Sequence, residues 1–479
     1  MRLLIPLAQH AFPRKLKTSA YECVRIQKVD GWKTDSEPSS FFPMKIPLLI
    51  RSRLFILAAG LLVLPSSMMP APVQSVPVGA ARIDITPQWP IRLAGYANRR
   101  GTDWKVEMPL HARALAIGEG ANAAVLVTVE LVGISSAISD SLASELEHSN
   151  GLKRDHVTVC AIHTHSGPAI AGYLVAERHD IPADERAAMI RYTSWLQERL
   201  REVAEAALAD RQPARLSWAQ GYAGFAVNRR ELKEGKWKRF GVVPNGPADR
   251  TLPVLVAQRD DGRIRAVLTS YACHCTANGG GMIIHPDWAG EASAQIESDN
   301  PGAVALVALG CAGDVGPYPK NGIEAARTNG REVAAEVARR VAKGLTPLPG
   351  VTAAAYRIVN LPLDKPDNKG VLEQVPLPVQ SWAFGKDLTM IFLGGEMASD
   401  YSLRLRRELD ADRLWINAYS NSVPCYVASH RMYPEGGYEV DASMLKYGWS
   451  GRLAAGTEDR IIAAVHEQVE ALGHGKGQR

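Results

Sequence analysis

The chain has 479 residues, of which 46% are hydrophobic and 22% charged. This is the composition of an ordinary soluble globular protein, and it excludes a disordered, collagen-like or coiled-coil chain. The formal net charge is +5, but residues 1–53 hold ten Lys/Arg and four Asp/Glu and so carry +6, which leaves 5 − 6 = −1 for the rest. Since the chain has no basic stripe with interleaved aromatic residues, we expect no nucleic-acid partner.

The N-terminal segment predicts a leader over residues 1–77. An apolar run of eleven residues, 54–64, follows Lys45, Arg51 and Arg53, and a Pro/Ser/Met/Ala-rich stretch follows the run. This pattern is typical of a secretory signal peptide, and Met44 as the true start would give a leader of normal length. The run is shorter than the ~18–20 apolar residues of a membrane span, so we expect no integral membrane domain in the mature chain. The predicted location is secreted or periplasmic; an uncleaved anchor or a buried segment remains an alternative.

Residues 78–479 alternate between strand-like and helix-like patterns. Strands are predicted, in chain order, at 78–87, 110–117, 123–132, 156–163, 214–219, 252–258, 264–273, 303–309 and 389–393. Helices are predicted at 135–149, 185–210, 321–343, 397–409 and 457–472. This alternation predicts an α/β fold in which mixed β-sheets are flanked by helices in a single large domain.

Two histidines end the predicted strand 156–163. They lie in the sequence His163-Thr-His165-Ser-Gly-Pro. Alternate residues of a strand point to the same side, so both imidazoles are expected to face one site. One can bind a metal through a ring nitrogen while the other acts as an acid or base.

Other predicted strands are also followed by residues that can bind a metal or transfer a proton. His274 lies between Cys273 and Cys275, Asp314 follows the strand 303–309, and Glu396 follows the strand 389–393. Taken alone, the position of His274 is as typical of a buried core residue as of a metal ligand. The position of Glu396 is also typical of an acidic residue that stabilises a helix N-terminus. Cys273 and Cys275 are expected to face away from His274 and to pack in the core. Five cysteines follow the leader; an exported protein can pair two or four of them, with a connectivity that the sequence leaves open.

The order of these motifs resembles the neutral/alkaline, non-lysosomal ceramidases. The motifs are His-Thr-His-Ser-Gly-Pro, strand-His-x-Thr, Ala-Gly-Asp, Gly-Glu before a helix, and Tyr…Tyr-Glu, and the match runs from about Val78 to Leu472. The resemblance implies the fold of the N-terminal catalytic domain of a ceramidase over residues 78–479.

The resemblance also implies one Zn²⁺ per chain and assigns its ligands. They are His163, His274, Glu396 and Tyr426. The assignment of Tyr426 rests on its position twelve residues before the pair Tyr438-Glu439.

Further residues match the catalytic part of the family pattern. His165 matches a second histidine that does not bind the metal, Arg229 an arginine that contacts substrate, and Tyr438 a tyrosine near the scissile carbonyl. Asp314 is interpreted as a residue that orients its loop or a neighbouring group. Arg230 is expected to be a solvated surface charge.

Two departures from the family pattern bear on the substrate. The serine that ceramidases place beside the zinc is Gly316 here, and the immunoglobulin-like C-terminal domain of ceramidases has no counterpart in this sequence. Together with the leader, the resemblance implies an exported zinc-dependent hydrolase that uses zinc-activated water to cleave an amide bond of an N-acyl, ceramide-like substrate. The expected partner is a small-molecule N-acyl or lipid substrate. Hydrolysis of an ester or lactone on the same scaffold, or a non-catalytic ligand-binding protein, remains an alternative. Substrate identity, acyl chain length and oligomeric state stay open.

Overall fold

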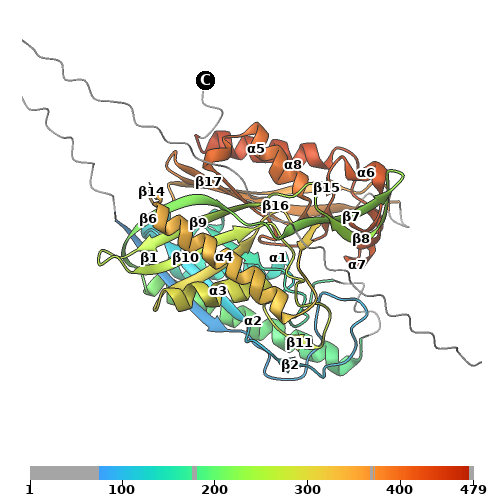
Figure 1. Ribbon diagram of the computed structural model, residues 1–479, viewed down its shortest axis with the longest axis horizontal. Helices are drawn as coiled ribbons and strands as arrows, with labels where there is room; N and C mark the ends of the chain where they lie inside the picture. Colours follow the sequence, from blue (N-terminus) through green and yellow to red (C-terminus); the bar gives the residue numbers. More distant parts are fainter. Residues whose placement is uncertain (1–74, 175–180, 367–369, 372, 474–479) are drawn as a thin grey trace, which may run out of the picture. The chain divides into compact units, whose positions relative to one another are not determined.

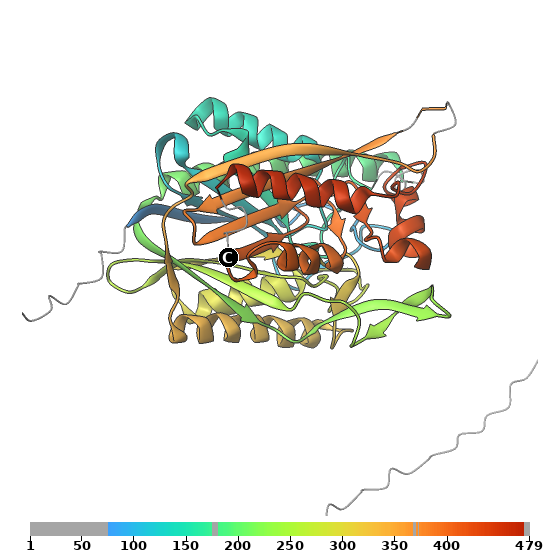
Figure 2. The ribbon, with the colours of Figure 1, turned by 90° about the horizontal axis from the view of Figure 1, so that it is seen from above.

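The structure is a computed structural model that describes residues 75–174, 181–366, 370–371 and 373–473. The described residues belong to one compact unit, while the predicted signal peptide and the start at Met44 lie outside them. In this unit two β-sheets face each other and helices cover the outer face of each sheet (Figures 1 and 2). The predicted α/β fold with mixed sheets flanked by helices is thus confirmed.

The larger sheet forms most of the unit. Within the described residues it has nine strands, with β14 beside β6 and the others in the order β12-β10-β9-β6-β1-β3-β4-β5. Their bounds are β1 Val76–Asp84, β3 His111–Ile117, β4 Ala124–Val129, β5 Val157–Ala161, β6 Gln212–Tyr222, β9 Thr251–Gln258, β10 Ile264–Tyr271, β12 Val304–Leu309 and β14 Thr346–Leu348. The pairs β4–β5 and β10–β12 are parallel and the rest are antiparallel. Strands such as β4 and β5 are buried along their whole length, which explains their continuous apolar sequences.

The smaller sheet packs on one face of the larger one. It contains β15 (Ala353–Pro362), β16 (Gln374–Phe384), β17 (Leu388–Leu393) and β19 (Leu414–Asn417) in that order. The layer between the sheets is filled by large side chains from both, among them Trp218, Leu268, Trp382, Phe392 and Trp415. Because these residues are removed from water together, this apolar layer fixes the two sheets against each other.

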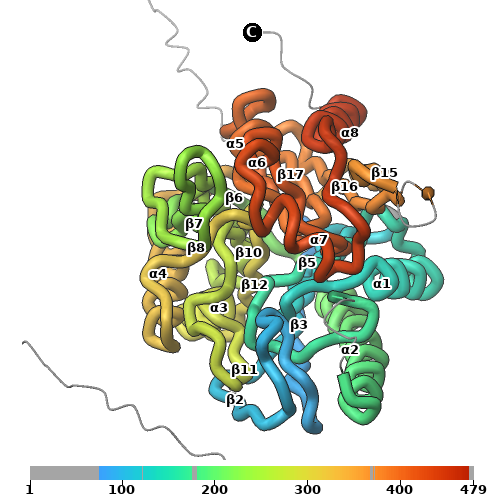
Figure 3. The backbone as a smooth tube through the Cα atoms, turned by 90° about the vertical axis from the view of Figure 1, so that its right-hand side faces the viewer, coloured from blue at the N-terminus to red at the C-terminus, as the bar shows by residue number. Residues whose placement is uncertain are grey.

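The helices form the two outer layers. Their bounds are α1 Ser136–Asn150, α2 Ala183–Ala209, α3 Asp287–Asp299, α4 Ile323–Lys343, α5 Ser399–Glu408 and α8 Thr457–Ala471. Figure 3 shows α2, α3 and α4 on one side of the sheets and α5 and α8 on the other. Each long helix buries one apolar stripe; in α2, for example, Tyr192, Leu196, Leu200 and Val203 recur at helical spacing and are buried. Among the described residues, no helix is both long and apolar enough to cross a membrane.

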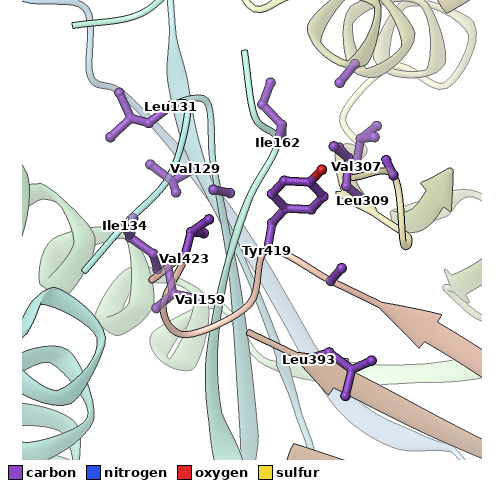
Figure 4. Close-up of a cluster of buried hydrophobic side chains, with 14 of the residues drawn as sticks. Val129, Leu131, Ile134, Val159, Ile162, Val307, Leu309, Leu393, Tyr419 and Val423 are labelled. Carbon is purple, nitrogen blue, oxygen red and sulfur yellow. The ribbon is translucent and has the colours of Figure 1, made fainter. Parts of the chain in front are cut away.

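The ends of the parallel strand pairs from both sheets meet at one end of the molecule. The pair β17–β19 is parallel like β4–β5 and β10–β12. After β19, the backbone N–H of Ala418 donates to Leu309 (2.8 Å) at the end of β12, and the N–H of Ala161 at the end of β5 donates to Tyr419 (3.0 Å). Figure 4 shows Ile162, Leu309 and Tyr419 among the buried side chains of this region. The loops that carry the predicted site residues therefore start from one rigid edge.

Short elements at this end were not predicted. They are β2 (Lys105–Val106), β7 (Ala226–Lys233), β8 (Lys236–Val243), β11 (Ile283–Ile284), β13 (Val315–Pro317), β18 (Glu396–Met397), β20 (Tyr426–Val427), α6 (Met432–Glu435), a π-helical turn (Tyr438–Ala442) and α7 (Ser443–Lys446). The small sheets β13-β7-β8 and β18-β20 carry predicted site residues. Helix α3 and strands β15 and β16 also lacked a prediction, because their sequences do not keep a clear helical or strand period.

Candidate active site

His163 lies just beyond β5 in a left-handed backbone conformation with φ 59°. Its side chain is buried, with 1% of the residue exposed. Ring atom Nδ1 is hydrogen-bonded to the backbone oxygen of Val132, which can only accept, so in the neutral ring Nε2 carries the lone pair. That Nε2 lies 3.0 Å from Oε2 of Glu396.

His274 repeats this arrangement from the end of β10. It is fully buried, and its Nδ1 lies 2.8 Å from the backbone oxygen of Ala312. Its Nε2 then also carries a lone pair in the neutral ring, and this atom lies 3.4 Å from Oε2 of Glu396 and 3.3 Å from the hydroxyl of Tyr426. Two imidazole lone pairs thus meet at one carboxylate oxygen, and the tyrosine hydroxyl lies beside one of these imidazoles.

Glu396 and Tyr426 are placed by a short parallel pairing between β18 and β20, in which they are direct partners. The hydroxyl of Tyr447 donates to Oε1 of Glu396. The other carboxylate oxygen, Oε2, is buried and has no hydrogen-bond partner among the residues that the structure describes. A buried carboxylate oxygen facing two lone pairs is costly without a cation between them, so these residues fit a metal ion.

The electrostatics of the site agree with this fit. Burial, with Arg229 acting in the same direction, lowers the pKa of His274 to about 3. Burial alone would raise the pKa of Glu396, but His163 and His274 outweigh it and hold this pKa well below its usual value. A neutral imidazole and an ionised carboxylate are the forms that bind a divalent cation.

His165 lies beside the same group. Its Nε2 is 3.2 Å from Nε2 of His163, and the ligand atoms of His163, His165 and His274 all lie within 4.8 Å of one another. The two histidines of the motif do face one site, but not by strand alternation, because β5 already ends at Ala161. Burial, with His163 and His274 nearby, lowers the pKa of His165 well below its usual value.

Arg229 joins the site from β7. Its guanidinium donates to the hydroxyl of Tyr426 (3.1 Å) and to the backbone oxygen of Gly313 (2.8 Å), and its Nε lies 3.1 Å from Glu439. It also lies over the ring of Phe240, 4.7 Å from the centroid. Arg229 therefore holds Tyr426 in place and puts a positive charge beside the proposed ligands.

The expectation that Arg230 is a solvated charge is wrong. Only 3% of Arg230 is exposed, and it forms ion pairs with Glu435 and Glu439. The segment from α6 to the π-helical turn lies against β7 and supplies both carboxylates, so the side chain of Arg230 is covered. The sequence gives no local signal for this long-range packing.

Asp314 is fully buried and is not among the residues that line the pocket. It accepts hydrogen bonds from the backbone N–H of Ser399 (2.7 Å) and from Asn228 (2.8 Å), and thereby joins the loop after β12 to α5 and β7. These contacts agree with its interpretation as a residue that orients its loop.

A pocket of about 450 Å³ opens from this group to the surface. Its lining includes Tyr96, His165, Arg229, Gly316, Tyr426 and Tyr438. Gly316 faces open space, since a Cβ added there would meet no atom within 4 Å. The departure from the family serine thus leaves a gap in the lining.

Seven of the eight predicted site residues come together at this pocket or directly behind it, and Asp314 supports the loop. Sequence reasoning missed Tyr447, Tyr96, whose ring lies 5.0 Å from that of His165, and Tyr419, whose ring lies 4.6 Å from that of His163. Tyr447 and Tyr96 have no neighbouring motif that would single them out, and Tyr419 lies in an aromatic and polar loop that gave it no specific role.

The cysteines do not take part in the site. The five in the described part of the chain, Cys160, Cys273, Cys275, Cys311 and Cys425, are all buried and unpaired. Cys273 and Cys275 belong to the hydrophobic core, as expected.

Comparisons with known proteins relate this fold and site to one family. The family model described as neutral/alkaline non-lysosomal ceramidase, N-terminal, matches residues 77–332. The neutral ceramidase from Pseudomonas aeruginosa has the same fold, with a TM-score of 0.67 and 19% identity over 85% of this chain and 76% of that chain. A ceramidase complexed with C2 gives a TM-score of 0.66 and 18% identity over the same shares. The search of curated proteins found no match. Because the family model covers more than half of the sequence, the chain belongs to the neutral/alkaline non-lysosomal ceramidase family.

Proposed function

We propose that this protein is an exported, zinc-dependent hydrolase that cleaves the amide bond of an N-acyl, ceramide-like substrate. Family membership supports an amide hydrolase as the general activity. The observation that carries the proposal is the meeting of His163 Nε2 and His274 Nε2 at the unpartnered Oε2 of Glu396, directly behind a pocket.

The proposed ligands of one zinc ion are His163, His274, Glu396 and Tyr426. When bound there, zinc would polarise the substrate carbonyl and lower the pKa of a water molecule toward ~7. The hydrogen bonds of both histidines to backbone oxygens fix which ring nitrogen faces the site, as carbonyl partners of metal-binding histidines do.

The remaining residues would handle the proton and the developing charge. Hydrolysis adds a water oxygen to the carbonyl carbon, breaks the C–N bond and leaves a proton on the amine nitrogen. His165 lines the pocket beside the ligands and would move that proton. Tyr438 would donate to the carbonyl oxygen, while Arg229, held by Glu439, would contribute its charge through Tyr426.

Export is part of the proposal because of the charged and apolar pattern of the leader. Residues up to roughly 70–78 are expected to be absent from the mature protein, since cleavage follows the apolar part of a signal peptide. N-terminal sequencing of the native protein measures this directly. A native cytoplasmic chain that begins at Met1 would contradict it.

The ligand assignment predicts how metal content responds to substitution. His163→Ala, His274→Ala and Glu396→Gln should each lower zinc well below about one ion per chain, because each removes one donor of a four-donor set. His165→Ala should keep the zinc and lose roughly 10²–10⁴-fold in kcat, the usual share of general acid–base catalysis. Elemental analysis and turnover with and without a chelator test both.

His466→Ala is the matched histidine control, since His466 lies on α8 and contacts Glu408 instead of the pocket. If His165→Ala loses zinc as fully as His163→Ala, His165 is itself a ligand and the set contains three histidines. Purified protein without stoichiometric metal would refute zinc dependence.

Gly316 predicts a substrate different from that of family members with serine at this position. Gly316→Ser should raise ceramide hydrolysis strongly, because the added hydroxyl enters space that no atom occupies within 4 Å of its Cβ. Gly316→Ala, which adds volume without a hydroxyl, is the control. An equal effect of both substitutions, or no gain with serine, would show that the missing hydroxyl does not determine the choice of substrate. Ester and lactone substrates assayed in parallel test the alternative reaction.

A substitution at Gly95 should displace the side chain of His165 without altering the histidine itself. Gly95 has φ 96°, and a Cβ there would lie 2.6 Å from Cα and Cβ of His165. Gly95→Ala should therefore lower kcat by about 10²-fold, as misplacement of a catalytic group by ~1 Å can do. Gly101→Ala is the control, because Gly101 also has a positive φ (74°) but has open space around it. This substitution should lower the free energy of unfolding by only ~1 kcal/mol. Equal activity of the two variants would show that the position of His165 does not limit turnover.

A further inference from the structure

The lining of the pocket carries positive charge without a matching negative charge. Its charged residues are Arg229, Lys320 and Lys446, and no aspartate or glutamate is among the described residues that line it. The carboxylate of Glu396 lies behind the lining, enclosed by His163, His274 and Tyr447.

The charge of Arg229 is already paired inside the protein. Arg229 and its neighbour Arg230 share Glu439, and Arg230 also contacts Glu435, which in turn pairs with Arg431. The residues Arg230, Glu435 and Glu439 are not among those that line the pocket, and Arg230 and Glu439 are buried. Arg229 is therefore already paired with Glu439 and Tyr426, so its side chain is not free to form an ion pair with a ligand.

The two lysines differ from Arg229 in this respect. In the part of the chain that the structure describes, neither Lys320 nor Lys446 has a carboxylate oxygen within 4 Å of its Nζ. The nitrogen of Lys446 instead lies 5.2 Å from the centroid of the Tyr438 ring. The acidic residue nearest before Lys446 in sequence, Asp441, accepts a hydrogen bond from Gly437 and faces Arg452.

Lys320 and Lys446 come from distant segments but line one cavity. Lys320 is exposed shortly after β13, and Lys446 is half-buried at the end of α7. The buried end of the same cavity is formed by His165 and Tyr426, and Phe240 and Tyr438 supply aromatic surface. Charges of one sign at a cavity with apolar walls attract a ligand of the opposite sign.

We infer that the substrate carries an anionic group, a carboxylate in the simplest case, and that Lys320 and Lys446 bind it at the mouth of the pocket. The substrate class is then an N-acyl amino acid or a similar acidic N-acyl compound, in contrast to a ceramide with an uncharged head group. Hydrolysis of such a compound consumes one water molecule and gives a fatty acid and an amino acid. The inference rests on the proposed amide hydrolysis and goes beyond it by naming the charge of the head group.

A matched pair of soluble substrates tests this directly. N-hexanoylglycine and N-hexanoylglycinamide have nearly the same size and the same scissile bond, but only the first has a carboxylate. Both are assayed as monomers in solution, so attraction of the lysines to an anionic lipid surface cannot produce a difference. The measured quantity is the ratio of kcat/KM for the acid to kcat/KM for the amide.

The wild-type ratio should be about 10 or more, should fall at least about threefold in Lys320→Met and in Lys446→Met, and should approach 1 in the double variant. It should also fall as salt is added, because salt screens exposed charges. Lys238→Met removes the same charge from β8, outside the lining, and should keep the wild-type ratio. A wild-type ratio of 1 or less, or an unchanged ratio in the double variant, overturns the inference.

A binding measurement separates this inference from the proposed hydrolysis. Calorimetric titration of both compounds into chelator-treated protein excludes binding of the carboxylate to zinc. The acid should bind about tenfold more tightly than the amide, and the double variant should lose this difference. If neither compound is cleaved but the lysine-dependent difference in binding remains, the hydrolysis proposal fails and the charge inference holds. If both are cleaved at equal rates and bind equally, or if neither binds, the charge inference fails.

Discussion

The buried carboxylate of Glu396 is the group on which the arrangement of the site depends. Tyr447 satisfies one of its oxygens, and the other faces the lone pairs of two neutral imidazoles. Removing a carboxylate from water costs several kcal/mol unless a partner replaces the lost hydration. A cation among the three groups would offset this cost, so the proposed metal site couples the order of these loops to the binding of metal.

The framework explains how three distant loops reach one point. Parallel strands from both sheets end on the same edge, and backbone hydrogen bonds join the end of β5 to Tyr419 and the end of β12 to Ala418. The histidine loops are joined as well, because the N–H of His165 donates to Cys275. Each proposed ligand is thus held by main chain that belongs to a sheet or is bonded to one, which limits how far it can move when a substrate binds.

The sequence revealed the parts of the site that lie next to strong local patterns. His163, His274 and Glu396 follow apolar strands directly, so periodicity placed them at strand ends, and the family motifs added Arg229, Tyr426 and Tyr438. Residues whose position depends only on long-range packing have no local sequence pattern and were not predicted. Tyr447 lies on a short segment without a motif, and the burial of Arg230 depends on two glutamates about two hundred residues away. Strand β8 is largely exposed and β7 contains mostly polar residues, so the hairpin β7–β8 lacked the apolar alternation that signals a strand.

Gly316, the departure from the family motif, lies at one end of the pocket, and the candidate ligands lie at the other. The candidate ligands and their supporting hydrogen bonds lie at the buried end. A change of side chain there would leave a buried carboxylate or imidazole without a partner. Gly316, Lys320 and Lys446 line the same cavity where it is open, and a change there leaves no buried group without a partner. Substitutions at the open end therefore alter the shape and charge offered to a substrate at little cost in stability. The substrate preference can therefore change at the open end while the candidate ligands stay in place.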